Sequence, residues 1–471
     1  MSLTITIIQW LLGALVMFVL LSLITLYIRG AFRWRSLFHL QDAVPPSDPR
    51  FISVIKTISG SIDTKGHVIA FWDTADRIQQ ARLDAIARAQ RSIQFETFMM
   101  TPGQRADDFA DAITRKSAEG VKVQLLVDSW GTRSLKDSYW ERLRSTGVEV
   151  VFFNPFDWRA PANYAGRTHR KLLVIDDQVA LIGGAGISGL WDGTEKSDDT
   201  KAWFDIEFSV KGEIVELLAL VFQAHWRGHR RDGGVTGIEL SMVYESRVYE
   251  SEQDKLKEHE KKNCSRNEYQ SKAPKTETAS NSESKNHSTI LIIPGTKPSY
   301  RNSPIETTKQ IFIASARERI WLSSPYFLPN MSTRNLLIEA QKSGVDVRIL
   351  TTSDRSDKKP VYYASYEVYG DLLKAGIQIF EYQPSMLHAK MMLIDDLWTN
   401  TGSANLDYRS FLHNDELDIL TDDRKLFENV EHMFEKGFSQ SEQITLHHWK
   451  QRSWLKHRML GNAVRLIQWQ L

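Results

Sequence analysis

"THRKLLVIDDQVALIGGAG" occupies residues 168–186, and a second version, "LHAKMMLIDDLWTNTGSAN", occupies residues 387–405. Both read His-x-Lys, four residues, Asp, six residues, Gly. A single His-x-Lys triplet says little, because most such histidines are ordinary surface or core residues. The same pattern at two distant places indicates a duplicated unit that carries a histidine and a lysine in each copy.

The residues after each lysine, Leu172–Ile175 and Met391–Ile394, are apolar and predict short buried strands. Because side chains alternate along a strand, each histidine and the lysine two positions later point to the same face. The Gly-Gly or Gly-Ser turn that follows permits close approach of the backbone and offers N–H donors. An imidazole, an ammonium group and such donors together suit an oxyanion such as a phosphate.

The segments before each phrase alternate between helical and strand patterns. In the first half these are residues 81–100, 106–131 and 139–155, with Gly120 as a helix stop. Residues 307–327, 332–354 and 366–384 repeat them in the same order, with Gly344 in the place of Gly120. The alternation predicts α/β structure with largely buried strands, present in two copies.

Shifts in composition divide the chain further. The stretch 244–287 is rich in Ser, Lys and Glu and almost free of large apolar residues, so we expect a disordered linker. The C-terminal stretch mixes Trp, Leu and Arg at helical spacing. It predicts a basic helix that lies either on anionic lipid or on the protein's own surface. The expected units are an anchor with a basic flank, a first domain, the linker, a second domain and the C-terminal helix, at residues 1–35, 60–243, 244–287, 288–440 and 441–471.

The N-terminus predicts a membrane anchor. Residues 3–28 carry no charge, and at 1.5 Å per residue such a helix spans a hydrocarbon core of about 30 Å. A cleavable signal peptide is the alternative, but no basic region precedes the apolar run and no small-residue cleavage site follows it. Arg29, Arg33 and Arg35 follow directly, so the positive-inside rule places the remainder in the cytoplasm, on a single-pass anchor in the cell membrane.

Composition bounds the function. A chain of 471 residues exceeds one ordinary core, and its net charge of +1 gives no electrostatic reason to expect nucleic acid. The single cysteine, Cys264, excludes an internal disulfide and a cysteine-based zinc site. No convincing metal-ligand cluster is visible, and no cofactor is expected. The sequence gives no indication of oligomeric state.

The two phrases resemble the paired HKD motifs of the phospholipase D superfamily, and the chain is most similar to bacterial cardiolipin synthases. The matching residues are His169, Lys171 and Asp176, and then His388, Lys390 and Asp395. The resemblance spans about residues 60–440 and includes WFDIEFSVKG, residues 203–212, which is similar to the family's acidic segment. It implies two α/β sandwich domains related by a pseudo-twofold axis, with one active site at their interface.

The resemblance also implies a mechanism. One histidine attacks a phosphodiester and forms a phosphohistidine, while the other protonates the departing alcohol and later deprotonates the incoming one. The residues themselves do not distinguish the two, and the family's usual order assigns His169 as the nucleophile and His388 as the acid and base. These roles need one neutral and one protonated imidazole near pH 7.

The remaining site residues follow from the same resemblance. Lys171 and Lys390 are expected to hold the phosphate oxygens. Further contacts to phosphate are expected from Ser403, Asn405 and Gly184. Asp205 and Glu416 are expected to orient the histidines across the interface. Although Asp176 and Asp395 belong to the motifs, we expect them to brace loops rather than touch the substrate.

One position departs from the family. The first copy usually carries Asn where this chain has Gly186, whereas the second copy has Asn405. Loss of an oxyanion donor typically costs about 10²- to 10³-fold in rate when nothing replaces it. A backbone N–H or Ser188 could substitute, the pocket could be wider, or the activity could be weak or altered. The first two explanations predict that Gly186→Asn keeps or raises activity.

The substrate follows from the anchor. Tethering raises the local concentration of a lipid and does little for a nuclease. We therefore expect a phosphatidyltransferase that acts on phospholipid, with phosphatidylglycerol as the substrate and cardiolipin as the product. A phospholipase D hydrolase that releases phosphatidic acid is the alternative. An anchored nuclease and an inactive membrane scaffold remain open.

Overall fold

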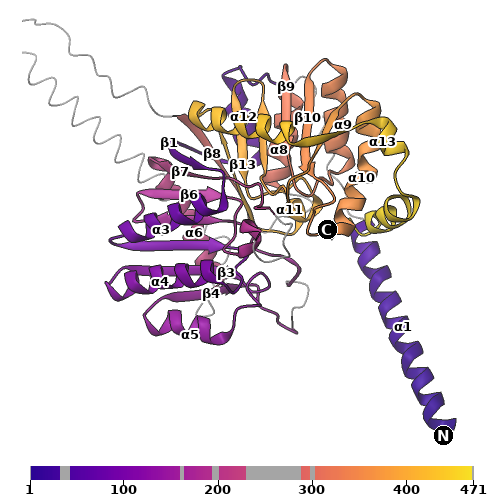
Figure 1. Cartoon of the computed structure of the whole chain (residues 1–471), viewed down its shortest axis with the longest axis horizontal. Coiled ribbons are helices and arrows are strands. Elements are labelled where there is room, and N and C mark those ends of the chain that lie inside the picture. The colour runs from indigo at the N-terminus through magenta and orange to yellow at the C-terminus, as the bar shows by residue number, and fades with distance from the viewer. Residues whose placement is uncertain are drawn as a thin grey trace, which may run out of the picture.

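The computed structural model describes residues 2–31, 43–159, 164–193, 201–229, 288–296 and 303–468 (Figure 1). The predicted linker, residues 244–287, lies outside the described residues. Helices and strands alternate along the chain in two similar sets.

The first half follows the order expected from its sequence patterns. It contains α2 (Arg50–Ser59), β1 (Ile62–Trp72), α3 (Ala75–Arg88), β2 (Ser92–Thr97), α4 (Gln104–Ala118), β3 (Lys122–Asp128), α5 (Asp137–Ser145), β4 (Glu149–Phe153), β5 (Leu172–Ile175), β6 (Val179–Gly183), η2 (Gly189–Asp192), β7 (Glu207–Lys211) and α6 (Glu213–His229).

The second half repeats this order. It contains β8 (Ser288–Gly295), α8 (Pro304–Ser315), β9 (Arg319–Ser323), α9 (Met331–Lys342), β10 (Asp346–Thr352), α10 (Lys359–Lys374), β11 (Gln378–Tyr382), β12 (Met391–Ile394), β13 (Trp398–Gly402), α11 (Tyr408–Leu412), β14 (Glu416–Thr421) and α12 (Arg424–Ser439). The two apolar runs after the lysines are β5 and β12, as predicted.

The strands form one 15-stranded sheet in the order β15-β11-β10-β9-β12-β13-β14-β8-β1-β7-β6-β5-β2-β3-β4. Outward from the central pair, β8-β14-β13-β12-β9-β10-β11 matches β1-β7-β6-β5-β2-β3-β4 strand for strand. β1 and β8 pair antiparallel, with Ile62 opposite Ile292 and Gly66 opposite Ser288. The halves are therefore related by a pseudo-twofold axis between β1 and β8, which confirms the duplicated α/β fold. Hydrogen bonds also join the two expected sheets into one.

Helices cover both faces of the sheet in each half. In the first half α3, α4 and α5 pack on one face and α6 on the other. A single buried cluster contains Phe222 and Trp226 of α6, Phe434 of α12, and strand residues of both halves such as Phe208 and Ile419. The shared core holds the halves together and fixes the positions of the strand ends at which the site is built.

The helix α1 (Ser2–Ala31) extends away from both halves (Figure 1). Its window Ile5–Ser22 has a mean hydropathy of 2.3 and is not buried by the rest of the protein. By length and composition, α1 can cross a membrane.

The C-terminal stretch differs from the single helix expected over residues 441–471. It begins with β15 (Ser441–Ile444), which pairs with β11 and so extends the sheet of the second half beyond residue 440. It continues as α13 (Leu446–Lys450), η3 (Trp454–Gly461) and α14 (Asn462–Arg465). One side of this segment packs on α10, where Trp449 Nε1 donates to the Tyr366 carbonyl at 2.9 Å.

A buried ionic network also joins the halves. On α6, His225 Nδ1 lies 2.6 Å from Glu96 Oε1, and its Nε2 lies 2.8 Å from Asp415 Oδ2 of the second half. Burial opposes the charged form, but the two carboxylates outweigh it and raise the pKa of His225. The two carboxylates thus favour the cationic form of His225 between the halves.

The variant His225→Leu should lose about 3 to 5 kcal/mol of stability, because it leaves two buried carboxylates without their cation. Since the folded-state pKa is raised, this contribution is complete below a pH of about 6.5 and is lost as the pH rises through the raised value. The Tm difference from the wild-type protein should therefore be largest at pH 6 and become smaller as the pH rises. His448→Leu, at an exposed histidine, is the control, and an equal Tm change in both variants would contradict the prediction.

Candidate active site

Each His-x-Lys phrase meets the acidic segment of the opposite half. The His169 amide donates to the Asp415 carbonyl at 2.8 Å, and the His388 amide donates to the Phe204 carbonyl at 2.7 Å. These bonds place Glu416 beside the first histidine and Asp205 beside the second. The geometry is the same on both sides because β7 and β14 occupy equivalent places in the sheet.

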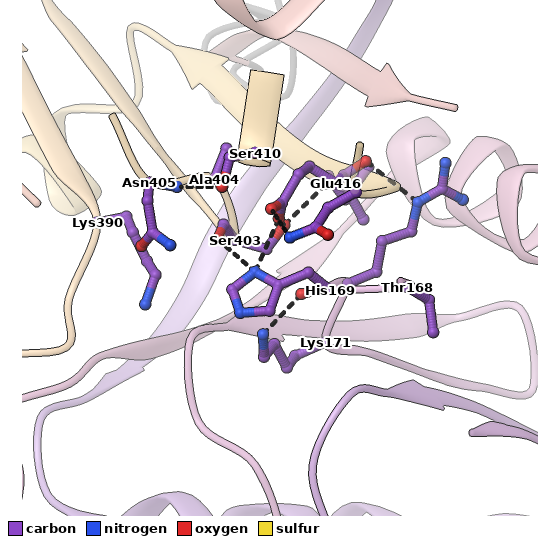
Figure 2. A network of polar contacts seen from close by, with 12 residues as sticks. Thr168, His169, Lys171, Lys390, Ser403, Ala404, Asn405, Ser410 and Glu416 are labelled. Atoms are coloured by element: carbon purple, nitrogen blue, oxygen red, sulfur yellow. Dashed lines mark hydrogen bonds and ion pairs between the residues drawn. The ribbon is translucent and has the colours of Figure 1, made fainter. Parts of the chain in front are cut away.

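His169 is held on one ring nitrogen. Its Nδ1 lies 3.0 Å from Glu416 Oε2 and 3.0 Å from the Ser403 carbonyl. Figure 2 shows the ring directed toward these two residues, with Lys171 and Lys390 on either side. An Nδ1–H that donates to these oxygens leaves Nε2 unprotonated, as a nucleophile requires.

His388 has the equivalent arrangement. Its Nδ1 lies 2.7 Å from Asp205 Oδ2. The same Oδ2 accepts a hydrogen bond from Trp191 Nε1 at 2.8 Å. Burial would raise the pKa of Asp205, but His388, Lys390 and the Trp191 hydrogen bond outweigh it and hold that pKa at about 2. Asp205 is therefore an anion that fixes the tautomer of His388.

Both lysines are buried at the same place. Lys171 Nζ donates to the His169 carbonyl at 2.6 Å, and Lys390 Nζ lies 3.0 Å from each ring nitrogen of His388. Burial and the charge of Lys390 lower the pKa of Lys171 to about 7, and burial lowers that of Lys390 to about 8. Two buried ammonium groups whose charged forms are disfavoured by burial form a good receptor for an anion.

The charge states differ from the expected pair of one neutral and one protonated imidazole. Burial, followed by the charges of Lys171 and Lys390, lowers the pKa of His169 well below its usual value. Burial and Lys390 lower the pKa of His388 to about 3. Both rings are therefore neutral at pH 7, because burial and the charges of the lysines disfavour a further positive charge.

Two residues expected to contact phosphate, Gly184 and Ser403, are engaged with other groups of the protein. The amide of Gly184 donates to the Ile206 carbonyl at 3.1 Å, and a Cβ at Gly184 would lie 2.2 Å from Asp205 Oδ1. The role of Gly184 is thus to leave room for Asp205, which corrects the expectation that it binds phosphate. The Ser403 hydroxyl donates to Glu416 Oε2 at 2.5 Å, so it positions Glu416 rather than facing the site.

Asn405 fits the expected role better. Its side chain is buried, and its Oδ1 has no hydrogen-bond partner among the described residues. Figure 2 shows Asn405 beside Lys390 and on the same side of the site as His169. Because its Oδ1 has no partner in the described part of the chain, the amide can turn to place its N–H donors toward a ligand oxygen.

The motif aspartates brace loops at the far ends of their strands. Asp176 accepts hydrogen bonds from the amides of residues 90–92, and Asp395 accepts them from the amides of residues 317–319. Both have positive φ, at 55° and 49°. Both aspartates are therefore engaged with these loops, the role expected of them, and they do not act as catalytic residues.

The structure adds residues that the sequence patterns did not identify. Trp191 packs against Gly186 and binds Asp205. Arg82 forms a buried ion pair with Glu207 and donates to the Gly186 carbonyl at 3.2 Å. The only sign of these residues in the sequence was Gly186, which lacks the asparagine side chain that the family usually carries there. Ser188, considered as its substitute, instead accepts a hydrogen bond from the Leu190 amide and caps η2.

Among the described residues, no group of three or more His, Cys, Asp or Glu side chains is arranged to hold a metal ion. The chemistry available comes from two neutral imidazoles, two lysines and two carboxylates. A neutral imidazole beside lysines suits nucleophilic attack on a phosphodiester.

Comparisons with known proteins agree with this geometry. A family model described as "Cardiolipin synthase, PLD-like domain" matches residues 83–226 and 310–437. Cardiolipin synthase 2 of Bacillus anthracis is 29% identical over 398 residues, which cover 83% of this chain and 68% of that protein. Cardiolipin synthase of Alkalihalophilus pseudofirmus is 28% identical over 439 residues, which cover 92% and 75%.

A solved structure shares the fold. Phosphatidylserine synthase of Haemophilus influenzae superposes with a TM-score of 0.61, at 13% identity, over 89% of this chain and 99% of that one. At this identity the similarity shows the fold alone.

The lysines predict how anion binding depends on pH. Sulfate, whose own charge is constant between pH 6 and pH 10, should bind at least about tenfold more weakly at pH 9.5 than at pH 6.5. The reason is that the pKa values of about 7 and about 8 place the loss of both ammonium charges in this interval. Calorimetric titration of the full chain measures this. Lys390→Met should reduce the dependence, whereas exposed Lys122→Gln should preserve it. A flat profile in the wild-type protein would contradict the prediction.

Proposed function

Because the chain belongs to the cardiolipin synthase family of phospholipase D-like proteins, we propose that it transfers a phosphatidyl group from one phosphatidylglycerol to the hydroxyl of another, giving cardiolipin and glycerol. As a member of this family it is a phospholipase D-type phosphatidyltransferase. The observation that carries the proposal is the crossed pair of imidazole–carboxylate contacts, His169 with Glu416 and His388 with Asp205.

In the first step His169 Nε2 attacks phosphorus. A P–N bond forms, the P–O bond to the glycerol head group breaks, and His388 gives its proton to the departing oxygen. Lys171 and Lys390 neutralise the phosphate oxygens, and Asn405 is placed to donate to one of them. The product of this step is a phosphatidyl-histidine and free glycerol.

In the second step the head-group hydroxyl of another phosphatidylglycerol attacks the same phosphorus. His388 takes the hydroxyl proton, the P–N bond breaks, and His169 is released. The proton that His388 needs in the first step is favoured when the substrate anion offsets the lysine charges. Lys390 Nζ, 3.0 Å from His388 Nε2 and with a pKa of about 8, is a proton source within reach.

Reconstituted full-length protein given phosphatidylglycerol should form cardiolipin and glycerol. His169→Ala and His388→Ala should each lower the rate at least about 10²-fold, because each removes a group that acts on the reacting atoms. His448→Ala, at an exposed histidine, should match wild type. Rapid denaturation of wild type at neutral pH, where a P–N bond survives, with lipid labelled at phosphorus should leave the label on the peptide that contains His169.

Other outcomes discriminate the alternatives. Phosphatidic acid as the main product would mean hydrolysis instead of transfer. Equal rates in wild type and both alanine variants would mean that the histidines are not catalytic, as in a scaffold. Label on the peptide that contains His388 would reverse the assignment of the two histidines.

We also propose that the catalytic end of the molecule faces the bilayer and that α1 anchors it as a single-pass protein with the two halves in the cytoplasm. Four exposed apolar residues lie just after strands of the sheet. Trp130 follows β3, and Phe156 and Trp158 follow β4. Met331 begins α9, which comes after β9. The carboxyl ends of these strands are where the histidines lie, because β5 and β12 run antiparallel to β2 and β9.

The C-terminal segment contributes further exposed apolar residues at the same catalytic end of the molecule. η3 lies beside the first turns of α10, where the His457 ring is 4.6 Å from that of Tyr366. Its other side exposes Trp454 and Leu455, each at 64%. The chain has no acidic residue after Glu442 but several Lys and Arg residues. Exposed apolar rings and aliphatic chains among cations suit a surface of anionic lipid.

A fluorescent probe can locate this face. In a Cys264→Ser background, Trp158→Cys and Leu455→Cys are each labelled with an environment-sensitive dye and reconstituted into phosphatidylglycerol vesicles. Both probes should shift to the blue and become brighter, because they enter the apolar interface. Leu397→Cys is the control, since this residue is exposed but lies in the turn between β12 and β13, at the far end of the sheet. An unshifted dye at 158 and 455, or an equal shift at 397, would contradict the docking face without bearing on catalysis.

A further inference from the structure

The two halves differ at one place behind the phosphate loop. Gly186 and Trp191 stand in the first half where Asn405 and Ser410 stand in the second, with the same spacing of five residues. In both halves the later residue contacts the carboxylate that holds a histidine: Trp191 binds Asp205, and Ser410 binds Glu416.

In the first half the indole fills the space of the missing side chain. A Cβ at Gly186 would lie 2.8 Å from the Met99 carbonyl oxygen and 3.0 Å from two ring carbons of Trp191. Trp191 is almost fully buried, and its ring packs edge-on against His388 with centroids 5.2 Å apart. The indole and the Met99 carbonyl therefore both compete with an asparagine side chain for this volume.

In the second half the smaller residue leaves room for the amide. Ser410 Oγ accepts a hydrogen bond from the Asn405 backbone amide at 3.1 Å. Asn405 can then project its side chain beside Lys390, as Figure 2 shows. Equivalent positions of the two halves thus hold different pairs of residues, a glycine with an indole in the first and an asparagine with a serine in the second.

We propose that Trp191 is a positioning residue for the acid and base, fixing Asp205 and through it His388, and that Gly186 lacks a side chain because the Met99 carbonyl and the indole together occupy its place. This inference rests on the proposed role of His388. One carboxylate oxygen, Asp205 Oδ2, receives both the indole N–H and the imidazole N–H. The indole N–H lowers the basicity of the carboxylate, so the Asp205–His388 pair releases its proton to the leaving alcohol more readily.

The variant Trp191→Phe keeps an aromatic ring and removes the donor. We expect kcat to fall at least about tenfold with KM within about twofold of wild type, as for other groups that orient a reacting residue. The limb of the kcat–pH profile that reports deprotonation of the Asp205–His388 pair should move to higher pH, because the carboxylate becomes more basic. A purely structural role for the ring would not move this limb.

Trp203→Phe is the matched control. Its ring lies 5.5 Å from that of His388, and in the described structure the hydrogen bond to Asp205 comes from the other indole. The control should leave the pH limb in place. The proposal is overturned if Trp191→Phe keeps the wild-type kcat and pH limb, or if Trp203→Phe moves the limb equally.

A second set of variants tests the competition for space. Gly186→Asn alone should lower kcat at least about tenfold, because it displaces the indole, which reverses the expectation drawn from the sequence. Gly186→Asn combined with Trp191→Ser copies the second half and should be more active than Gly186→Asn alone. A double variant no more active than the single one overturns the competition. If wild type releases phosphatidic acid, the transferase proposal fails, but these tests stand because both reactions use the His388 proton.

Discussion

The exchange of carboxylates between the halves is the constraint on which the site depends. Each imidazole takes its Nδ1 partner from the opposite half, at 3.0 Å for His169 and 2.7 Å for His388. Neither half can orient its own histidine, because the acidic segment that it carries serves the other one. The shared core, the β1–β8 pair and the His225 network therefore all maintain the same catalytic geometry. One active site per duplicated chain is the consequence.

Burial sets the electrostatics of this site. Two lysines, two histidines and two carboxylates share a region with little solvent, so each charge is costly unless a neighbour offsets it. Burial therefore lowers the pKa values of both lysines and keeps both imidazoles neutral. A phosphodiester anion supplies the missing negative charge and restores the charged forms of the cations. Substrate binding and the readiness of the acid are thus coupled by ordinary electrostatics.

The two halves have the same strand order and equivalent buried ion pairs, but some side chains near the site differ between them. Arg82 with Glu207 in the first half matches Lys309 with Asp418 in the second, at equivalent places next to the loops. In contrast, Trp191 and Asn405 have no counterparts of their own kind. The proposed nucleophile and the proposed proton carrier need different surroundings, and a duplicated frame allows each half to be specialised separately.

Local patterns determined the two copies of the α/β fold, the strands that carry the histidines and lysines, and the identity of both pairs. They could do so because strand alternation and apolar runs depend only on neighbouring residues. The contacts of His169 with Glu416 and of His388 with Asp205, across 247 and 183 residues, were expected only from family resemblance. The place of Gly184 beside Asp205, the engagement of Ser403 with Glu416 and the indole beside Gly186 were decided by the tertiary structure alone. These depend on which side chains share a volume at the interface, and spacing along the chain does not encode that.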